Sequence, residues 1–369
     1  MEPTVDCSVL VPVLNEERYI RASVEAMRQQ RFDGSLEFLF ADGGSTDRTR
    51  EILESLAGDD PRIRVLFNPR GTVSSGLNVC LRHARGRWAL RMDAHTVYPD
   101  DYATLGVARL AQGDTRWVSG PQIPEGHGPV SRAVALALSM PLGRGGSRKW
   151  GHSGAAGEEY ELDTGVFAGV WSRETLLEYD GWDERWPRNS DSEMAARFLA
   201  RGERLVCLPA MGGRYVPRDS LGGLWRQYLG YGEYRARTYH RHPHSLRPSH
   251  LLAPAIVLTL GSAVAAPAAV RRVGRLGALL YLGVLASAGV RSRPDARSPG
   301  DAATVPVVLA VMHLAHGLGQ LRGWGRHGLP LAAVAKLAGV GRDRGEGQGQ
   351  GSPEAVDSPS LTGSGELRW

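Results

Sequence analysis

Two acidic motifs each follow a short apolar run, and this arrangement constrains the fold more than any other feature of the chain. The run at residues 36–41 leads into Asp42, and the run at residues 88–92 leads into Asp93. Short apolar runs that end in turn residues are typical of buried parallel strands. In an open α/β sheet the carboxyl ends of such strands face one crevice, so we expect both aspartates to lie at one site.

Further strands and helices alternate along the first 245 residues. Residues 8–14 and 65–67 form two more apolar runs, and helical spacing of apolar side chains predicts helices between the strands. This alternation predicts an α/β fold with a doubly wound, largely parallel sheet. The expected helices lie at residues 18–30, 48–56, 73–83 and 194–201, and a strand-helix pair and a last strand are expected at 166–179 and 205–208.

Two segments of the chain depart from this alternation. Residues 123–157 are rich in glycine and serine and have no clear apolar period, so we expect a mobile loop over the site. Beyond residue 245, Ala, Leu, Val and Gly dominate the composition. Residues 251–270 and 302–321 are each long enough to span a bilayer, whereas residues 276–290 are marginal.

These segments divide the chain into three regions. Residues 1–245 are expected to form the globular α/β domain, and residues 246–325 are expected to form membrane helices. Their small residues suit close helix packing in lipid, and a buried helical subdomain is the alternative. Residues 326–369 are expected to form a short helix and a disordered tail, because the tail is polar and rich in glycine.

The charge of the chain does not indicate a nucleic-acid partner. The formal net charge is +5, but Lys149 and Lys336 are the only lysines among 44 basic residues, which reflects genome base composition more than a phosphate-reading surface. No zinc-finger spacing or RNA-recognition signature is present, so no nucleic-acid binding is expected. Three cysteines in or beside apolar runs predict a reduced, cytosolic core: Cys7, Cys80 and Cys207.

The sequence Asp93-Ala-His95 is a candidate cation site. A carboxylate and an imidazole two residues apart on an extended segment can bind one divalent cation from the same side. A single histidine at a strand end is more often structural, but its position beside Asp93 favours ligation. A cation held there could bind a diphosphate, which suggests transfer from a nucleotide-activated donor.

Six motifs follow one another along the chain: SVLVPVLNEE, ADGGSTDRT, SSGLNVCLRHARG, LRMDAHTVYPDDY, the helix start Asp191-Ser-Glu193, and QYLGYGEYR. In this order they resemble the motifs of the inverting family 2 glycosyltransferases, particularly the succinoglycan-type exopolysaccharide enzymes. The resemblance covers roughly residues 6–240, and such enzymes also carry a hydrophobic C-terminal region.

The resemblance implies a fold, a reaction and a location. It implies a glycosyltransferase A-type domain over residues 1–245, at the cell membrane with the catalytic domain in the cytoplasm. The implied reaction is metal-dependent, inverting hexosyl transfer from a nucleotide sugar, most simply a UDP-sugar, to a lipid-linked or cell-surface polysaccharide acceptor. Two alternatives stay open: a membrane-anchored sugar-nucleotide-binding protein without turnover, and a sugar-nucleotide pyrophosphorylase. The second lacks support, because residues 9–17 contain neither glycine nor lysine.

The resemblance also implies the donor-binding residues. Asp42 resembles the aspartate that reads the uracil edge of a UDP-sugar, although a turn or helix-capping acid is the alternative. The first nucleotide-binding loop and two later motifs supply the others, where Asn-Glu-Glu could also cap the next helix. These further donor-binding candidates are Pro12, Asn15, Glu17, Asn78 and Arg235.

Asp93 and His95 match the metal-binding DXD element, with histidine in place of the second acid. The implied cofactor is Mn²⁺ or Mg²⁺, and imidazole favours Mn²⁺. Gln227, Tyr231 and Arg235 match the QXXRW motif of processive relatives only in part, which favours addition of one sugar. The guanidinium of Arg235 suits a contact with the diphosphate.

Asp191 aligns with the catalytic base of the family. Inversion needs a carboxylate opposite the leaving group to take the proton of the acceptor hydroxyl. Glu193 is the fallback candidate, and the alternative is that both acids only favour the helix N-terminus. Trp182 and Asp183 are acceptor-subsite candidates, with a core role for Trp182 equally open.

Overall fold

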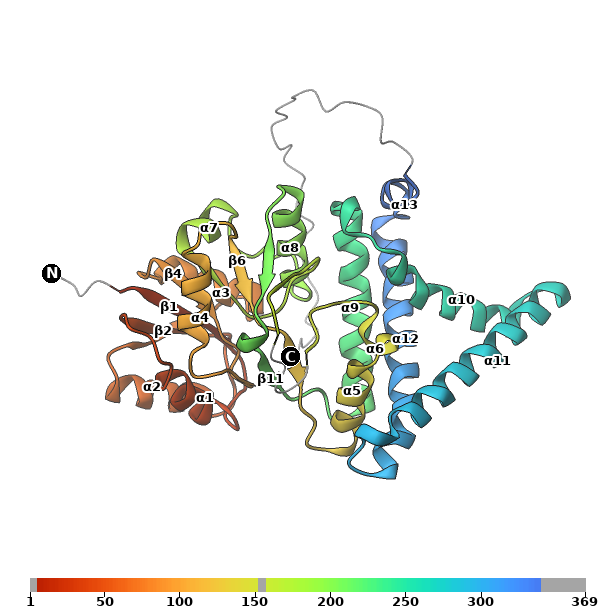
Figure 1. Ribbon diagram of the computed structural model, residues 1–369, viewed down its shortest axis with the longest axis horizontal. Helices are drawn as coiled ribbons and strands as arrows, with labels where there is room; N and C mark the ends of the chain where they lie inside the picture. Colours follow the sequence, from red (N-terminus) through yellow and green to blue (C-terminus); the bar gives the residue numbers. More distant parts are fainter. Residues whose placement is uncertain (1–4, 152–156, 340–369) are drawn as a thin grey trace, which may run out of the picture.

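The computed structural model describes residues 5–151 and 157–339, which form an α/β domain followed by a group of long helices (Figure 1). The first half contains the expected alternation of strands and helices. In chain order these are β1 (Cys7–Val13), α1 (Ile20–Arg28), β2 (Leu36–Asp42), α2 (Thr49–Asp59), β3 (Ile63–Phe67), α3 (Val73–His83), β4 (Trp88–Arg91), β5 (Thr96–Val97) and α4 (Tyr102–Leu110).

The second part of the α/β domain has shorter strands. Its elements are β6 (Trp117–Ser119), β7 (Gln122–Pro124), α5 (Pro129–Ser139), α6 (Pro141–Arg144), β8 (Tyr160–Glu161), β9 (Gly169–Ser172), α7 (Arg173–Glu178), α8 (Ser190–Ala200), β10 (Leu205–Cys207) and β11 (Gly213–Tyr215). The long helices follow: α9 (Leu221–Arg241), α10 (Leu252–Ala265), α11 (Ala268–Arg291), α12 (Pro299–His327) and α13 (Leu331–Leu337).

The main sheet has the strand order β3-β2-β1-β4-β9-β6-β10-β8. Strands β1, β2, β3 and β4 are parallel to one another, as are β6 and β10, whereas β9 and β8 run antiparallel to their neighbours. The expected largely parallel sheet is confirmed. A smaller sheet has the strand order β5-β11-β7, and its strand β5 directly follows the Asp93 motif in the chain.

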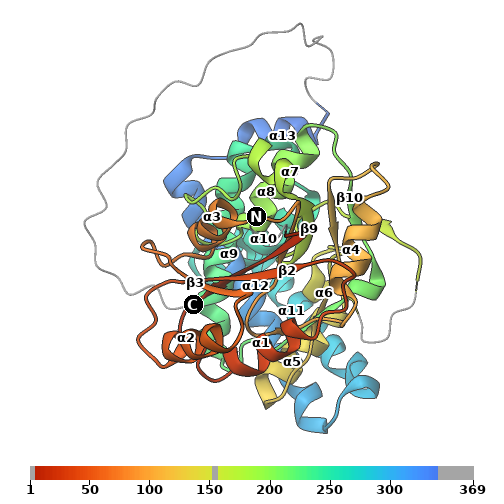
Figure 2. The same cartoon turned by 90° about the vertical axis from the view of Figure 1, so that its left-hand side faces the viewer.

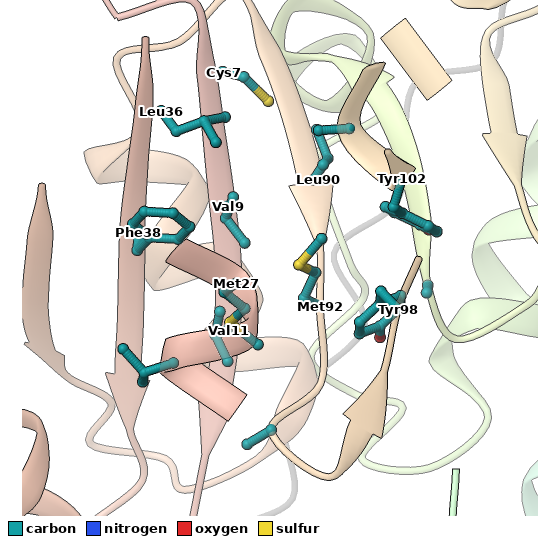
Figure 3. Close-up of a cluster of buried hydrophobic side chains, with 14 of the residues drawn as sticks. Cys7, Val9, Val11, Met27, Leu36, Phe38, Leu90, Met92, Tyr98 and Tyr102 are labelled. Carbon is teal, nitrogen blue, oxygen red and sulfur yellow. The ribbon is translucent and has the colours of Figure 1, made fainter. Parts of the chain in front are cut away.

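Alternate side chains of the central strands enter two separate cores. Val9 and Val11 of β1 pack with α1, α2 and α4 on one face, where Phe38 of β2 joins them (Figure 3). Leu10 of β1 packs on the other face with α3, α7 and α8. Because both faces are covered, β1 and β2 are mainly apolar, as buried parallel strands are.

The view along the sheet shows the two layers of helices around it (Figure 2).

The three cysteines are free and buried, as expected for core thiols. Burial raises the pKa of Cys80 to about 12, which keeps this thiol protonated and unreactive.

The prediction of a mobile loop over residues 123–157 is wrong for the residues of this segment that the structure describes. Helix α5 follows β7 there, and Ala133, Val134 and Ala137 of α5 pack into a core with α12. The serine and glycine content of the segment led to the prediction of a loop. The apolar face of α5 packs on α12, which begins about 160 residues later in the chain, so no local pattern indicated this contact. Residues 152–156 of the expected loop lie outside the described residues.

The expected helices after residue 245 are present with different bounds. Helix α10 ends at Ala265, and α11 extends well beyond the expected residues 276–290 at its N-terminal end. Helix α12 packs along α9, so the expected boundary at residue 245 falls beside a closely packed interface. Helix α13 lies where a short helix was expected, and the expected tail lies outside the described residues.

Candidate active site

The loops that follow β1 and β2 are hydrogen-bonded to each other. The N–H of Asn15 donates to Ser45 Oγ at 2.9 Å, and the Asn15 side-chain oxygen accepts from the N–H of Thr46 at 2.8 Å. Asn15 has a φ of 56°, a left-handed conformation that asparagine tolerates better than most residues. Its side chain therefore fixes the relative position of the two loops.

Glu17 reinforces the same connection between the loops. Its carboxylate accepts from the N–H of Arg48 at 3.0 Å, and its own N–H donates to Asp47 Oδ2 at 3.1 Å. Pro12 lies in β1 opposite Ala41 of β2. The three residues expected in the first nucleotide-binding loop thus lie at the carboxyl edge of the sheet, where Asn15 and Glu17 have structural partners.

Asp42 ends β2 and is 2% exposed. Its carboxylate accepts from the hydroxyl of Ser45 at 2.5 Å and from the Ser45 N–H at 3.2 Å. These contacts stabilise the turn into Gly43 and Gly44, so the alternative role as a turn acid is present. Each carboxylate oxygen has further lone pairs, so the turn contacts leave acceptor capacity for a nucleobase N–H.

Asp93 is held by a two-pronged contact with the preceding strand. The guanidinium of Arg91 donates to both Asp93 oxygens, at 2.9 and 3.1 Å, and the Asp93 N–H donates to the Tyr98 hydroxyl at 2.9 Å. Arg91 is buried, and such a fork fixes the plane of the carboxylate. Asp93 therefore has a defined orientation before any ligand binds.

His95 lies beside a second carboxylate that the sequence did not indicate. Its Nδ1 is 3.0 Å from Oε1 of Glu16. Burial lowers the pKa of His95, but the hydrogen bond and charge of Glu16, with the charge of Asp93, raise it above its ordinary value overall. With Nδ1 on Glu16, Nε2 is the ring nitrogen available to a metal ion.

The residues around Asp93 and His95 fit a cation shared with a substrate. Among residues 5–151 and 157–339, no group of three or more His, Cys, Asp or Glu side chains is arranged to hold a metal. Mg²⁺-type sites commonly use one or two protein carboxylates and take other ligands from substrate phosphates. Asp93 and His95 suit that kind of site.

Asp191 is the second residue of α8, and Asn189, which directly precedes the helix, has a φ of 61°. Its carboxylate makes no hydrogen bond or ion pair with any residue that the structure describes. Its charge interacts with Arg91, Lys149 and Arg235. Because Arg91 also holds Asp93, the fold brings Asp191 and the candidate metal site together.

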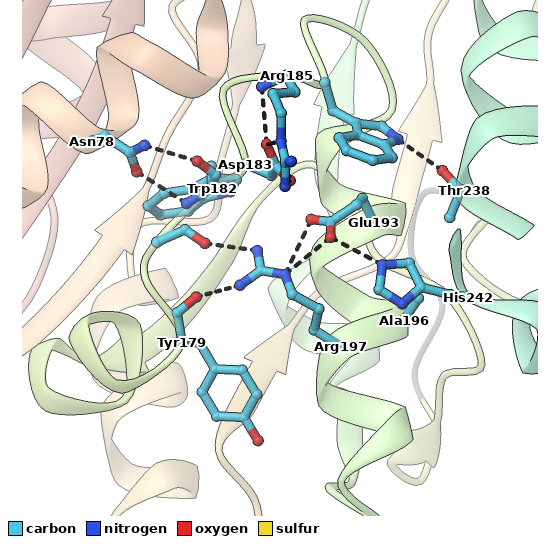
Figure 4. A network of polar contacts seen from close by, with 12 residues as sticks. Asn78, Tyr179, Trp182, Asp183, Arg185, Glu193, Ala196, Arg197, Thr238 and His242 are labelled. Atoms are coloured by element: carbon cyan, nitrogen blue, oxygen red, sulfur yellow. Dashed lines mark hydrogen bonds and ion pairs between the residues drawn. The ribbon is translucent and has the colours of Figure 1, made fainter. Parts of the chain in front are cut away.

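Glu193, two residues later, has the opposite environment. It is fully buried, and it accepts from Arg197 Nε at 3.1 Å and lies 3.1 Å from His242 Nε2 (Figure 4). Arg197 in turn donates to the carbonyls of Tyr179 and Gly181. Glu193 therefore joins α8 to two neighbouring segments, and its carboxylate is already fully engaged.

Asn78 and Trp182 contact each other away from solvent. The Asn78 amide donates to the Trp182 carbonyl at 2.8 Å and accepts from the Trp182 N–H at 2.9 Å (Figure 4). The Trp182 ring is 2% exposed and packs edge-on against Trp171. The structure places Trp182 in the core, and Asp183 beside it is paired with Arg185 at 2.7 Å.

Two basic side chains complete the surroundings of Asp191. Arg235 Nη2 lies 3.1 Å from Ser192 Oγ, and burial lowers the pKa of Arg235 to about 10, which leaves it charged at neutral pH. Burial lowers the pKa of Lys149 to about 8. No local sequence signal beyond the scarcity of lysine indicated Lys149, because its interaction with Asp191 depends on tertiary contacts.

Comparisons with known proteins give a consistent assignment. The model of the family described as Glycosyl transferase family 2 matches residues 8–154. The chain is 34% identical over 237 residues to the succinoglycan biosynthesis protein ExoA of Rhizobium meliloti, covering 63% of this chain and 70% of that protein.

Two further similarities have lower identity. A dolichyl N-acetyl-alpha-D-glucosaminyl phosphate 3-beta-D-2,3-diacetamido-2,3-dideoxy-beta-D-glucuronosyltransferase of Methanococcus voltae is 24% identical, over 61% of this chain and 71% of that protein. Among solved structures, the mannosyltransferase PcManGT of Pyrobaculum calidifontis, in complex with GDP-Man and Mn²⁺, has a TM-score of 0.49 and 18% identity. That match covers 85% of this chain and 88% of the mannosyltransferase.

Proposed function

Because this chain belongs to the family 2 glycosyltransferases, we propose that it catalyses metal-dependent, inverting transfer of one sugar from a UDP-sugar to a lipid-linked saccharide. The α/β domain is the glycosyltransferase A-type domain. One observation carries the proposed mechanism. The carboxylate of Asp191, which has no hydrogen-bond partner among the described residues, lies where its charge interacts with Arg91, and Arg91 orients the candidate metal ligand Asp93.

Each residue of the site has a distinct task in the proposed reaction. Asp42 accepts from the uracil imide, and Asp93 and His95 hold the cation, which when bound offsets the charge of the departing diphosphate. Arg235 and Lys149, whose charges interact with that of Asp191, bind the diphosphate of the donor. Asp191 takes the proton of the acceptor hydroxyl as that oxygen attacks the anomeric carbon.

The chain's relatives support the proposed acceptor class. The name of the Methanococcus relative specifies a sugar carried on a dolichyl phosphate lipid, and that of the Rhizobium relative specifies succinoglycan biosynthesis. Both names concern the assembly of saccharides, and the Methanococcus name includes a lipid carrier. A lipid-linked acceptor also suits a chain with helices long enough to enter a bilayer.

The test is release of nucleoside diphosphate by the full-length, detergent-purified protein. A panel of UDP-, GDP- and dTDP-sugars is supplied with Mn²⁺ and a polyprenyl-phosphate-linked saccharide. We expect product with a UDP-sugar, and Asp191→Asn is expected to slow it by at least about a hundredfold while binding UDP normally. Glu174→Gln is the matched control, an exposed acid in the first turn of α7 away from the site.

Two outcomes would contradict the proposal. Tight binding of a nucleotide sugar with no release under any condition would identify a binding protein without turnover. Full activity in Asp191→Asn would remove this carboxylate as the base.

A further inference from the structure

Among residues 5–151 and 157–339, three helices are long and apolar enough to cross a membrane: Pro248–Ala265, Ala268–Asp295 and Pro299–His327. Their surroundings differ in the folded chain. In an apolar stretch of 18 residues within each helix, the share that is buried by the rest of the protein is 11%, 22% and 44%, respectively. The third helix is therefore covered by protein far more than the first two.

Exposed apolar side chains follow the same division. On α11, Val273, Leu276 and Leu280 are 69%, 68% and 71% exposed, and Val264 of α10 is 79% exposed. On α12, the most exposed large apolar side chain is Val307, at 48%. Apolar surface of the kind that acyl chains cover is concentrated on the hairpin formed by α10 and α11.

Contacts between the helices show that they form a triangle. A Cβ at Gly317 of α12 would lie 2.4 Å from the carbonyl of Ala253, at the start of α10. Near the opposite end of α12, a Cβ at Gly289 of α11 would lie 2.9 Å from Pro306. Helices α10 and α11 thus leave α12 at separate points and meet at a tip away from it (Figure 1). Three helices arranged in this way cannot all cross one bilayer.

Helix α12 packs closely along α9, so α12 could enter the hydrocarbon core only if α9 entered it as well. Glu233 of α9 pairs with Arg322 of α12 at 3.4 Å and also pairs with Arg326. Helix α9 further carries the exposed charged residues Arg226 and Arg241. A charged side chain at the bilayer centre is strongly unfavourable. The polar α9 and the helix packed along it therefore belong outside the bilayer core.

Arginines lie at both ends of the uncharged stretch of α11. Arg275 and Arg291 are separated by about 24 Å at the helical rise, somewhat less than the hydrocarbon thickness of about 30 Å. Between Arg275 and Arg291 the helix has no charged residue. Arginine side chains can extend toward headgroups at both ends of such a helix.

The base of the hairpin is also basic. A cavity of 560 Å³ between the end of α11 and the start of α12 is lined by Arg293 and Arg297. A neighbouring cavity of 700 Å³ is lined by arginines and acids in equal number, and its Arg132 is paired with Asp301. The first cavity is therefore the basic one, and a basic pocket at this level suits the phosphates of lipid headgroups.

We propose that only the α10–α11 hairpin crosses the bilayer, and that α12 lies with α9 at the membrane surface on the catalytic side. The chain then crosses the membrane twice. Its C-terminal region lies on the same side as the catalytic domain, whereas three spans would place it on the opposite side. This inference concerns the surface in contact with lipid and is independent of the chemistry proposed above.

The test is labelling of single introduced cysteines in cells by a membrane-impermeant maleimide, before and after permeabilisation. The three native cysteines are buried, and the parent chain serves as the unlabelled control. Arg82→Cys reports the catalytic domain, Arg272→Cys the hairpin tip and Lys336→Cys the helix after α12, all at exposed positions. We expect Lys336→Cys to behave like Arg82→Cys, and Arg272→Cys to be labelled from the opposite side.

Each other labelling pattern overturns the proposal. Lys336→Cys labelled opposite to Arg82→Cys would show that α12 crosses. Arg272→Cys labelled from the catalytic side, or from neither side, would show that the hairpin does not cross.

A second experiment asks which helix contacts acyl chains. Leu280→Arg places a charge on the hairpin, and Val307→Arg places the same charge on α12. We expect Leu280→Arg to reduce the membrane-inserted fraction by about tenfold or more, and Val307→Arg to leave it unchanged. Equal loss in both variants would contradict the assignment of α12 to the surface.

Discussion

At the residue scale, the two acids at the start of α8 differ in what surrounds them. Glu193 is buried against Arg197 and His242, whereas Asp191 has no hydrogen-bond partner among the described residues. The structure therefore distinguishes Glu193, whose carboxylate stabilises the fold, from Asp191, whose carboxylate is available for proton transfer. The distinction could not come from sequence, because both acids occupy equally favourable helix N-terminal positions.

This difference predicts that neutralising the two acids has different effects on the stability of the protein. Glu193→Gln is expected to lower the free energy of unfolding by about 2–3 kcal/mol, below the cost of breaking a fully buried pair because Arg197 is partly exposed. Asp191→Asn is expected to leave it unchanged. Thermal unfolding of the two detergent-purified variants measures this. Equal destabilisation would show that Asp191 has a structural partner.

The lowered pKa of Lys149 predicts that donor binding depends on pH. Burial lowers its pKa to about 8, so the ammonium is present below pH 8 and is lost as the pH rises through that value. We expect UDP affinity to fall over the same interval. Lys149→Arg should hold the affinity to higher pH, because guanidinium stays charged, and Lys149→Met should lower it at neutral pH. An unchanged profile in Lys149→Met would exclude Lys149 from the donor site.

His95 predicts a preference among divalent cations. An imidazole ligand favours Mn²⁺ over Mg²⁺, whereas a second carboxylate suits Mg²⁺. His95→Asp is therefore expected to raise the activity ratio of Mg²⁺ to Mn²⁺. Initial rates with each cation after removal of bound metal measure the ratio. Full activity of the parent protein in excess EDTA, with no bound metal remaining, would contradict a cation at this position.

At the element scale, α9 links the site to α12. Arg235 of α9 contacts Ser192 beside Asp191, while the opposite part of the helix packs on α12 at very short range. A Cβ at Gly319 of α12 would lie 2.1 Å from the carbonyl of Leu229. The position of Arg235 therefore depends on glycines in a helix far along the chain.

This packing predicts a difference between two glycine substitutions in α12. Gly319→Ala is expected to separate α9 from α12, which lowers both the melting temperature and the transfer rate. Gly325→Ala meets no neighbour within 4 Å and is expected to be neutral or stabilising by up to about 1 kcal/mol, because alanine favours a helix. Melting temperature and turnover of both variants provide the measurement. An active, stable Gly319→Ala variant would show that the interface tolerates a wider spacing.

At the scale of the whole molecule, the catalytic domain and the C-terminal helices share a core. Tyr239 of α9 donates to Gln320 at 2.8 Å and accepts from Trp324 Nε1 at 2.7 Å, both on α12. Helix α5 of the catalytic domain packs against α12 as well, and Arg132 pairs with the buried Asp301 at 2.9 Å. The two regions are therefore not independent units joined by a linker.

The shared core predicts how a truncated chain behaves. A chain that ends at residue 245 should no longer fractionate with membranes, because the α10–α11 hairpin is absent. It should also melt at a lower temperature than the full-length protein and aggregate, because Ala236 and Tyr239 lose the cover of α12. Alkaline carbonate extraction should leave the full-length protein in the membrane. A monomeric truncated chain as stable as the full-length protein would contradict the shared core.

The sequence alone determined the α/β domain and the positions of the motifs at its sheet edge. Apolar runs and turn residues are local signals, so β1, β2 and β4 and the acids at Asp42 and Asp93 could be placed from short stretches of chain. The family followed from the order of those motifs. The presence of long apolar helices also followed, because hydropathy is a property of composition.

Only the tertiary structure decided which of these residues act together. Its key contacts join residues that are far apart in sequence. Asp191 interacts with Arg91 and Lys149, and His95 pairs with Glu16. The burial of Trp182 and the cover of α12 by α9 were likewise undetermined, because hydropathy describes a segment without its neighbours. Contacts between distant segments depend on how the elements pack, and no local pattern encodes that packing.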